Sequence, residues 1–260
     1  MKKELQAIIA IAYRDLLKFL RDKPRIMATF AFPLIFILIM GGSMDANLSS
    51  SIGFNLLEFV FTGIFAQTLF QSTASGVISL IEDRENDFSQ EIFVSPISRY
   101  SIIIGKILGE TSVSMAQGLV ILLLGFFLGI NLTITTVLLL LPVSLIVCFL
   151  GGAFGLMIMA NLSNQRTANQ IFPFLLFPQF FLAGVFTPMG NLPIHLLVLS
   201  RIAPMTYAVD FIRNFYYLGS LAAPKVLLHP MLLNLGIILA MSVVFVLVGT
   251  IAFVKNERNR

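Results

Sequence analysis

Long apolar runs separated by short polar stretches dominate the chain. Six of these runs are long enough for a helix to cross about 30 Å of hydrocarbon, which takes roughly 20 residues. They lie near 26–44, 56–80, 104–130, 137–160, 171–189 and 231–254. The pattern therefore predicts an all-α integral membrane fold with six transmembrane helices.

The first 23 residues follow a different pattern. Their apolar positions share one face of a helix, and the Lys and Arg residues fall mainly on the other face. Such a helix is typical of the membrane interface, with its basic face toward anionic headgroups. We expect an N-terminal interfacial amphipathic helix over 1–23, which Pro24 ends. A single membrane domain over 24–256 would follow.

One further apolar run, 192–203, is too short to span a bilayer and is flanked by Pro193 and Pro204. The whole stretch 190–230 is mostly apolar, although it lies between the last two expected spans. We therefore expect an outer re-entrant helical hairpin before the last span.

The outer hairpin also carries charged residues, and they suggest a local contact. Asp210 is expected to pair with Arg201 or Arg213, which would stabilise the hairpin.

Composition and charge agree with a membrane protein. Hydrophobic residues make up 57% of the chain and charged residues 12%, which excludes an ordinary soluble domain. With the six spans in place, 14 of the 17 Lys and Arg residues fall on one side. Because cytoplasmic loops are the ones enriched in Lys and Arg, a multi-pass protein with both termini in the cytoplasm is expected.

Motifs for catalysis or metal binding are absent from the sequence. The string closest to a phosphate-binding loop, Gly105-Lys106-Ile107, lacks the required glycine spacing. Cys148 is the single cysteine, and His195 and His229 stand far apart, so no zinc-type spacing exists. We expect no catalytic, cofactor-binding or metal-binding residues in this chain.

A polar stripe runs along the second expected span, with Gln67, Gln71 and Ser75 at every fourth position. Because unpaired polar groups are costly in hydrocarbon, the stripe should avoid lipid. It would line a substrate path or form hydrogen bonds between helices. Phe177 and Phe180 of the fifth span would contact an amphipathic substrate on that path, or pack against lipid or the core.

The segment 81–101 between the second and third spans is charged, yet it presents apolar side chains. Asn86 or Asp87 can cap a short helix there, in which Phe88, Ile92 and Phe93 share one face. Apolar residues on one helical face dock into the groove of a partner protein or lie on the membrane surface, and we favour docking.

At this point the chain resembles a known family. The strings EDREND and EIFVSPISRYSIIIGKILGE, followed later by FLAGVFTPMGNLPIHLLVLSRIAPMTYAVDFIRN, resemble type-2 ABC transporter permeases. Within that family the chain looks closer to drug-resistance and nodulation-factor export permeases than to polysaccharide permeases.

This resemblance implies the membrane subunit of an ATP-driven exporter in the inner membrane of a prokaryote. Such a subunit moves an amphipathic drug, lipid or glycolipid outward, and it contacts membrane lipid but no nucleic acid. A second copy or a sibling permease would complete the channel. Two copies of a cytoplasmic P-loop ATPase would bind ATP and Mg²⁺, and this chain would bind neither.

The resemblance also implies roles for particular residues. The second and fifth spans would form the translocation path, including Gln67, Gln71 and Phe180. The ATPase-coupling residues would be Phe88, Ser89, Glu91, Ile92 and Phe93.

Two other functions remain open from the residues alone. An ion-coupled secondary transporter would use Glu58 or Glu110 as a proton relay, although no inverted repeat is evident. A membrane component without transport activity, such as a sensor, would have little use for the polar stripe of the second span.

Overall fold

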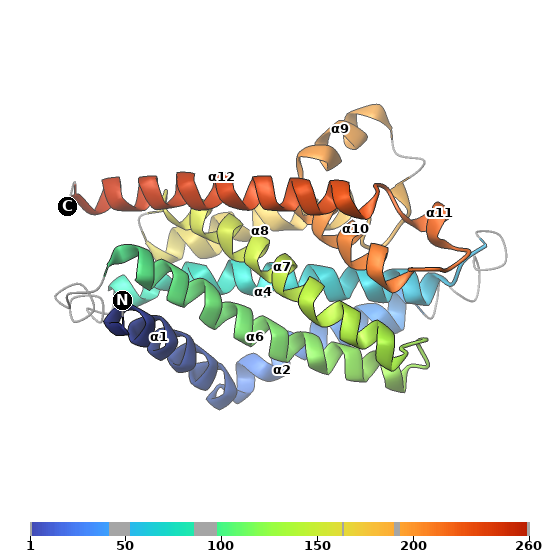
Figure 1. The fold of residues 1–260 in the computed structure, drawn as a ribbon, viewed down its shortest axis with the longest axis horizontal. Helices are drawn as coiled ribbons and strands as arrows, with labels where there is room; N and C mark the ends of the chain where they lie inside the picture. Colours follow the sequence, from blue (N-terminus) through green and yellow to red (C-terminus); the bar gives the residue numbers. More distant parts are fainter. Residues whose placement is uncertain (1, 42–52, 86–97, 163, 190–192, 259–260) are drawn as a thin grey trace.

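The computed structural model describes residues 2–41, 53–85, 98–162, 164–189 and 193–258. All regular structure within these residues is helical, as the apolar pattern predicts. Figure 1 shows the long helices side by side, with both ends of the chain at the same end of the molecule.

The described helices follow one another along the chain. They are α1 Lys2–Arg21, α2 Lys23–Phe36, the π-helical turn η1 Ile37–Gly41, α4 Leu56–Glu85, α6 Arg99–Phe127, α7 Ile134–Met159, α8 Gln165–Leu182, α9 Ile194–Ile202, α10 Pro204–Tyr216, α11 Ala223–Val226 and α12 Met231–Arg258.

Side-chain caps explain where three of the long helices begin. The Ser98 side chain accepts a hydrogen bond from the backbone N–H of Ser101 at the start of α6. Thr133 caps α7 and Asn164 caps α8 in the same way. Each cap satisfies a backbone donor that the first turn of a helix leaves unpaired.

Four helical stretches in the described residues are long and apolar enough to cross a membrane. They are Leu56–Ile81, Tyr100–Phe127, Ile134–Met159 and Ala223–Phe253. Their positions agree with the predicted second, third, fourth and sixth spans. The chain therefore has the helices of a multi-pass membrane protein.

The predicted count of six spans is not confirmed, and the first expected span is one of the two exceptions. Over the expected 26–44, α2 contains Pro33 and ends at Phe36, where η1 continues with π-type hydrogen bonds. Proline lacks a backbone N–H, so it interrupts regular α-helical bonding. Residues 42–44 lie outside the described residues.

The fifth expected span, 171–189, is shifted toward the N-terminus in the structure. α8 has 18 residues, begins at Gln165, and carries Arg166 and Asn169 in its first turns. It ends before Gly184, whose φ of 64° turns the chain. Because of this polar start, α8 is not among the described helices that are long and apolar enough to cross a membrane.

α4 lies at the centre of the fold and packs against α6, α7, α8 and α10. Its closest neighbour is α7, on which Gly151 and Gly155 face the backbone carbonyls of Phe70 and Ala74. Even one added methyl group at either glycine would overlap these carbonyls. Small residues spaced in this way let two helices in a membrane approach closely.

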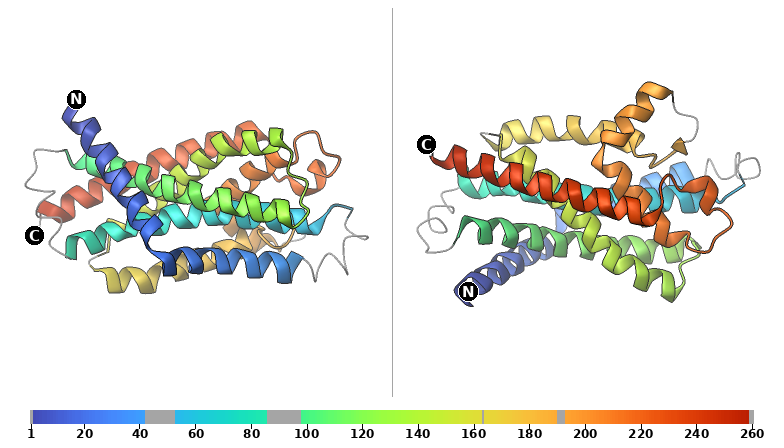
Figure 2. Two further views of the ribbon diagram at one scale, coloured as in Figure 1. Left: turned by 90° about the horizontal axis from the view of Figure 1, so that it is seen from below. Right: turned by 45° about the horizontal axis from the view of Figure 1, so that its top comes forward.

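The segment 190–230 contains the expected short helices, but they do not form a matched hairpin in one outer layer. α9 projects from the bundle, whereas α10 lies inside it (Figures 1 and 2). Residues Pro204–Asn214 are buried because α10 packs against α4, α7 and α12. The predicted re-entrant hairpin is therefore not confirmed.

α1 packs along the first turns of α6 and crosses the bundle obliquely (Figure 2). Phe19 and Asp15 face the protein, whereas Leu5, Ile9 and Tyr13 form an exposed apolar row. The helix is amphipathic as predicted, with one side against α6 and an apolar row available to a further apolar surface.

Candidate functional site

A cavity of about 420 Å³ lies between α4 and α8. From α4 it is lined by Gln71, Ser75 and Ile78, and from α8 by Asn169, Phe172, Pro173, Leu176, Phe177 and Phe180. These lining side chains are apolar or uncharged and polar. A pocket with a few polar groups on an apolar wall is suited to an amphipathic molecule.

The polar stripe of α4 continues from this cavity into the core. The side-chain amide of Gln67 donates to Gln71 Oε1 over 3.4 Å, and Gln67 is buried. The Gln67 Oε1 atom is buried without a hydrogen-bond partner among the described residues. The stripe therefore carries hydrogen-bonding capacity that its own helix does not use.

Aromatic side chains form the opposite wall of the cavity. The ring centroids of Phe177 and Phe180 lie 5.9 Å apart, and those of Phe177 and Phe181 lie 5.6 Å apart. Phe180 is buried, whereas 60% of Phe177 is exposed. The sequence predicts a path along two separate helices. Four of the residues predicted for it line the same cavity, namely Gln71, Ser75, Phe177 and Phe180.

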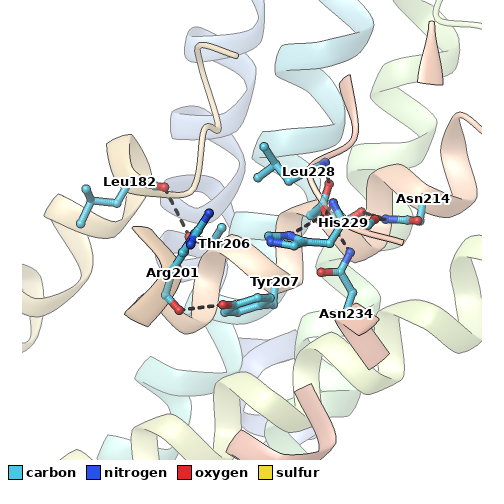
Figure 3. A network of polar contacts seen from close by, with 9 residues as sticks. Leu182, Arg201, Thr206, Tyr207, Asn214, Leu228, His229 and Asn234 are labelled. Atoms are coloured by element: carbon cyan, nitrogen blue, oxygen red, sulfur yellow. Dashed lines mark hydrogen bonds and ion pairs between the residues drawn. The ribbon is translucent and has the colours of Figure 1, made fainter. Parts of the chain in front are cut away.

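Asp210 on α10 is a second polar centre near the start of α12, and its partners Leu228, His229 and Asn234 are labelled in Figure 3. Its carboxylate accepts hydrogen bonds from the backbone N–H groups of Leu228 and His229, at 2.9 and 2.8 Å. It also accepts one from Asn234 Nδ2 at 2.8 Å, and His229 Nδ1 lies 3.5 Å away. These contacts tie α10 to the beginning of α12.

The expected pairing of Asp210 with Arg201 or Arg213 is not found among the described ion pairs and hydrogen bonds. Arg201 contributes its backbone carbonyl, which accepts from the Tyr207 hydroxyl at 2.7 Å (Figure 3). Backbone donors before α12 instead satisfy Asp210, while the Arg213 guanidinium donates to the carbonyls of Phe59 and Val185.

Arg213 points from α10 toward α4. Its guanidinium donates to the carbonyls of Phe59 and Val185, at 3.0 and 3.4 Å, and to Thr62 Oγ1 at 3.4 Å. The side chain is fully buried and covers the face of the Phe59 ring. Arg213 therefore holds three segments together, namely α4, α10 and the turn after α8.

The two glutamates that an ion-coupled carrier would use are both engaged. Glu58 accepts a hydrogen bond from Asn131 Nδ2 at 2.8 Å. Glu110 lies 3.0 Å from Lys106 Nζ, and Lys106 in turn lies 2.7 Å from Asp15. Glu110 therefore belongs to a buried group of charges.

Comparison with known proteins then decides the family. Residues 6–217 match the family described as ABC-2 type transporter. The chain belongs to this family. It is an integral, multi-pass membrane protein of the ABC-2 type, and membership implies association with ABC ATPase subunits.

Two relatives illustrate the range of the family. The transport permease ycf38 of Cyanophora paradoxa is 26% identical over 261 residues, covering 96% of this chain and 89% of the relative. The multidrug ABC transporter permease YbhR of Escherichia coli K12 is 27% identical over 141 residues, covering 54% of this chain and 38% of the relative. The resemblance to ABC permeases is thereby confirmed.

The ATPase-coupling residues expected for a permease of this family lie outside the described residues. Phe88, Ser89, Glu91, Ile92 and Phe93 belong to the segment 86–97. The described neighbours of this segment are the end of α4 and Ser98, whose backbone N–H donates to the Glu4 carboxylate. α1 thus contacts the chain directly beside the expected coupling segment.

Sequence reasoning missed two groups of residues. Asn169 and Phe172 line the cavity at helical spacing from Leu176 and Phe180. Phe172 lies within the expected fifth span, and starting that helix at Gln165 would have included Asn169 as well. The contact of Asp15 with Lys106 joins residues 91 positions apart, and no local pattern announces such a pair.

Proposed function

We propose that this chain is the membrane subunit of an ATP-driven exporter and that the cavity between α4 and α8 is part of its path. The observation that carries the proposal is the cavity itself. Gln71, Ser75 and Asn169 supply uncharged hydrogen-bonding groups, and Phe177 and Phe180 supply an apolar wall. An amphipathic molecule satisfies both kinds of surface at once.

The energy source in this proposal is a partner protein. ABC-2 membership implies ABC ATPase subunits, and two copies would bind ATP and Mg²⁺ below the membrane domain. A second permease, identical or a sibling, would complete twelve spans. The first span would then be α2 continued by η1, and the fifth span would be α8. α9 and the buried α10 would lie toward the outer side of the membrane. Both termini and α1 would face the cytoplasm of a prokaryotic cell.

The ion-coupled alternative has less support from the geometry. A proton relay requires a carboxyl group that changes its protonation state during each cycle. Glu110 is held 3.0 Å from Lys106 Nζ in a buried ion pair and does not line the α4–α8 cavity. Glu58 is bound by Asn131 and lies apart from the α4–α8 cavity.

Transport by inverted membrane vesicles that contain the chain and its ATPase tests the proposal. The fluorescent amphipathic dye Hoechst 33342 serves as the probe, and its ATP-dependent removal from the membrane is followed. Gln71→Leu combined with Asn169→Leu removes two polar groups of the cavity, and we expect loss of dye movement. Gln170→Leu is the matched control, because Gln170 is exposed on α8 and does not line the cavity.

Two outcomes would count against this function. Normal dye movement by the double variant would remove the cavity from the path. Dye movement that survives inactivation of the ATPase but collapses with the proton gradient would favour the ion-coupled carrier.

A further inference from the structure

Three charged side chains form a buried cluster where α1 meets α6. Lys106 Nζ lies 2.7 Å from Asp15 Oδ2 and 3.0 Å from Glu110 Oε1. The side chains of Asp15, Lys106 and Glu110 are only 2%, 2% and 3% exposed. On the outer side, Arg14 Nη2 lies 2.9 Å from Asp15 Oδ1. We call Asp15, Lys106 and Glu110 the charge cluster.

Glycines on α6 bring α1 into close contact on both sides of Lys106. A methyl group at Gly105 would lie 3.2 Å from Ile11 Cβ, and one at Gly109 would lie 3.0 Å from Ala12 Cα. Both distances are tighter than ordinary van der Waals contact. Because the two backbones interlock and the charges bridge them, α1 cannot slide along α6 without breaking the charge cluster.

The charge cluster also reaches α4. The Glu110 carboxylate occupies the space in which a side chain at Gly76 would lie. Gly76 directly follows Ser75, which lines the cavity between α4 and α8. A continuous series of contacts therefore runs from α1, through Lys106 and Glu110, to Gly76, the residue next to Ser75 of the cavity wall.

Three buried charges are an expensive way to join helices, because apolar residues of similar size often give equal or greater stability. Charged groups inside membrane domains are instead associated with function. We propose that the charge cluster is the joint through which movement of α1 and α6, as one rigid unit, is transmitted to α4 and the cavity. Asp15, Lys106 and Glu110 are positioning residues in this role, which rests on the proposed ATP-driven transport.

A variant without charges separates this role from stability. Asp15→Asn, Lys106→Met and Glu110→Gln together remove all three charges and leave none of them buried alone. We expect the triple variant to assemble with the ATPase and to hydrolyse ATP at a rate close to that of the wild type. Dye transported per ATP should fall roughly two- to thirtyfold, the range of measured coupling effects. Normal transport per ATP by this variant would overturn the proposal.

A disulfide can replace the joint. Ile11 Cβ and a Cβ at Gly105 are 3.2 Å apart, a few tenths of an ångström below the about 3.5–4.5 Å between bridged cysteines. Ile11→Cys with Gly105→Cys therefore links α1 to α6 on oxidation, and the native Cys148 is buried. In the triple variant we expect oxidation to restore transport per ATP, and reduction to abolish the rescue.

The same disulfide without the neutral substitutions keeps the test decisive if the triple variant fails to fold. Because α1 and α6 move together in our proposal, oxidation should leave transport unchanged. Loss of transport on oxidation would show that α1 must move against α6, which would overturn the proposal. If the wild-type chain binds no ATPase, the proposed function itself is contradicted. ATPase binding by the wild type is measured first, before these variants are compared.

Discussion

The guanidinium carbon of Arg213 lies 3.6 Å from the centroid of the Phe59 ring. This contact joins a buried cation on α10 to an aromatic face on α4, and the Phe59 carbonyl accepts a hydrogen bond from the same guanidinium. A cation over a ring is stabilised most when both groups are desolvated, as they are here. The pair fixes α10 against the central helix.

Replacing Arg213 with Met should destabilise the fold. The Val185 carbonyl would lose its guanidinium donor, and a buried group left unpaired costs roughly 1–3 kcal/mol, whereas the Phe59 carbonyl would keep the Thr62 hydroxyl as a donor. We expect the apparent melting temperature in detergent to fall by several degrees. A thiol-reactive dye can report this transition, because the single cysteine, Cys148, is buried and becomes reactive on unfolding.

Arg201→Met is the matched control, since the Arg201 side chain is exposed and its backbone carbonyl makes the contact with Tyr207. An equal fall in melting temperature for the two variants would argue against a special role for the Arg213 contacts.

Asp210→Asn should loosen the start of α12 locally. An amide presents one acceptor oxygen, whereas the carboxylate accepts three hydrogen bonds, from Leu228, His229 and Asn234. We expect faster amide hydrogen exchange at Leu228 and His229, measured by mass spectrometry, and unchanged exchange in α7. Unchanged protection at 228 and 229 would mean that Asp210 does not hold this junction.

Gly155→Ala should destabilise the contact between α7 and α4. The added methyl group would overlap the Ala74 carbonyl, which is backbone and cannot move aside cheaply. Overpacking of this kind costs about 1–3 kcal/mol, and the dye assay on Cys148 would detect it as earlier unfolding.

Gly236→Ala provides the comparison for Gly155→Ala, because Gly236 lies within α12 and no described atom beyond its chain neighbours and the nearby backbone of α12 lies within 4 Å of an added methyl group. It should leave stability unchanged or raise it slightly, since alanine favours helix. Earlier unfolding of both variants alike would refute the packing explanation.

The contact of Glu4 with the start of α6 should depend on pH. Hydrogen bonds from the Ser101 side chain and from the Ser98 backbone lower the pKa of the exposed Glu4 carboxyl below its ordinary value of 4.5. A lowered pKa in the folded state stabilises the contact above pH 4.5, and this contribution is lost as the pH falls through the lowered value.

Glu4→Gln tests this dependence. Amide exchange in the first turns of α1 should be faster in the variant than in the wild type at pH 6. The two proteins should exchange alike once the pH lies well below 4.5. A difference of constant size across this range would exclude titration of Glu4 as its cause.

The sequence predicts those parts of the structure that depend on local pattern. The apolar runs place four of the long helices within a few residues, and the stripe of Gln71 and Ser75 faces the cavity that also contains Phe177. The predicted start of the fifth helix, residue 171, lies after the observed start at Gln165. Hydropathy places it too late because Gln165 and Arg166 are polar, although Asn164 caps the helix. Hydropathy alone does not detect such a polar first turn.

Contacts between distant segments were not predictable. Glu110 is a candidate proton relay in the sequence, yet it is buried in a group of charges that Asp15 and Lys106 complete. Arg213 was expected beside Asp210, only three positions away, yet it reaches Phe59 on another helix. In both cases the partner that satisfies the charge comes from a remote part of the chain, and one sequence does not reveal that pairing.

The long separation between Asp15 and Lys106 also bears on how the chain is made. Lys106 emerges from the ribosome 91 residues after Asp15, so α1 is synthesised long before its partner exists. Lys106 and Glu110 are four positions apart on α6 and can enter the bilayer as a neutral pair. Asp15 joins them afterwards, so packing of α1 onto α6 is a late step in the folding of the newly synthesised protein.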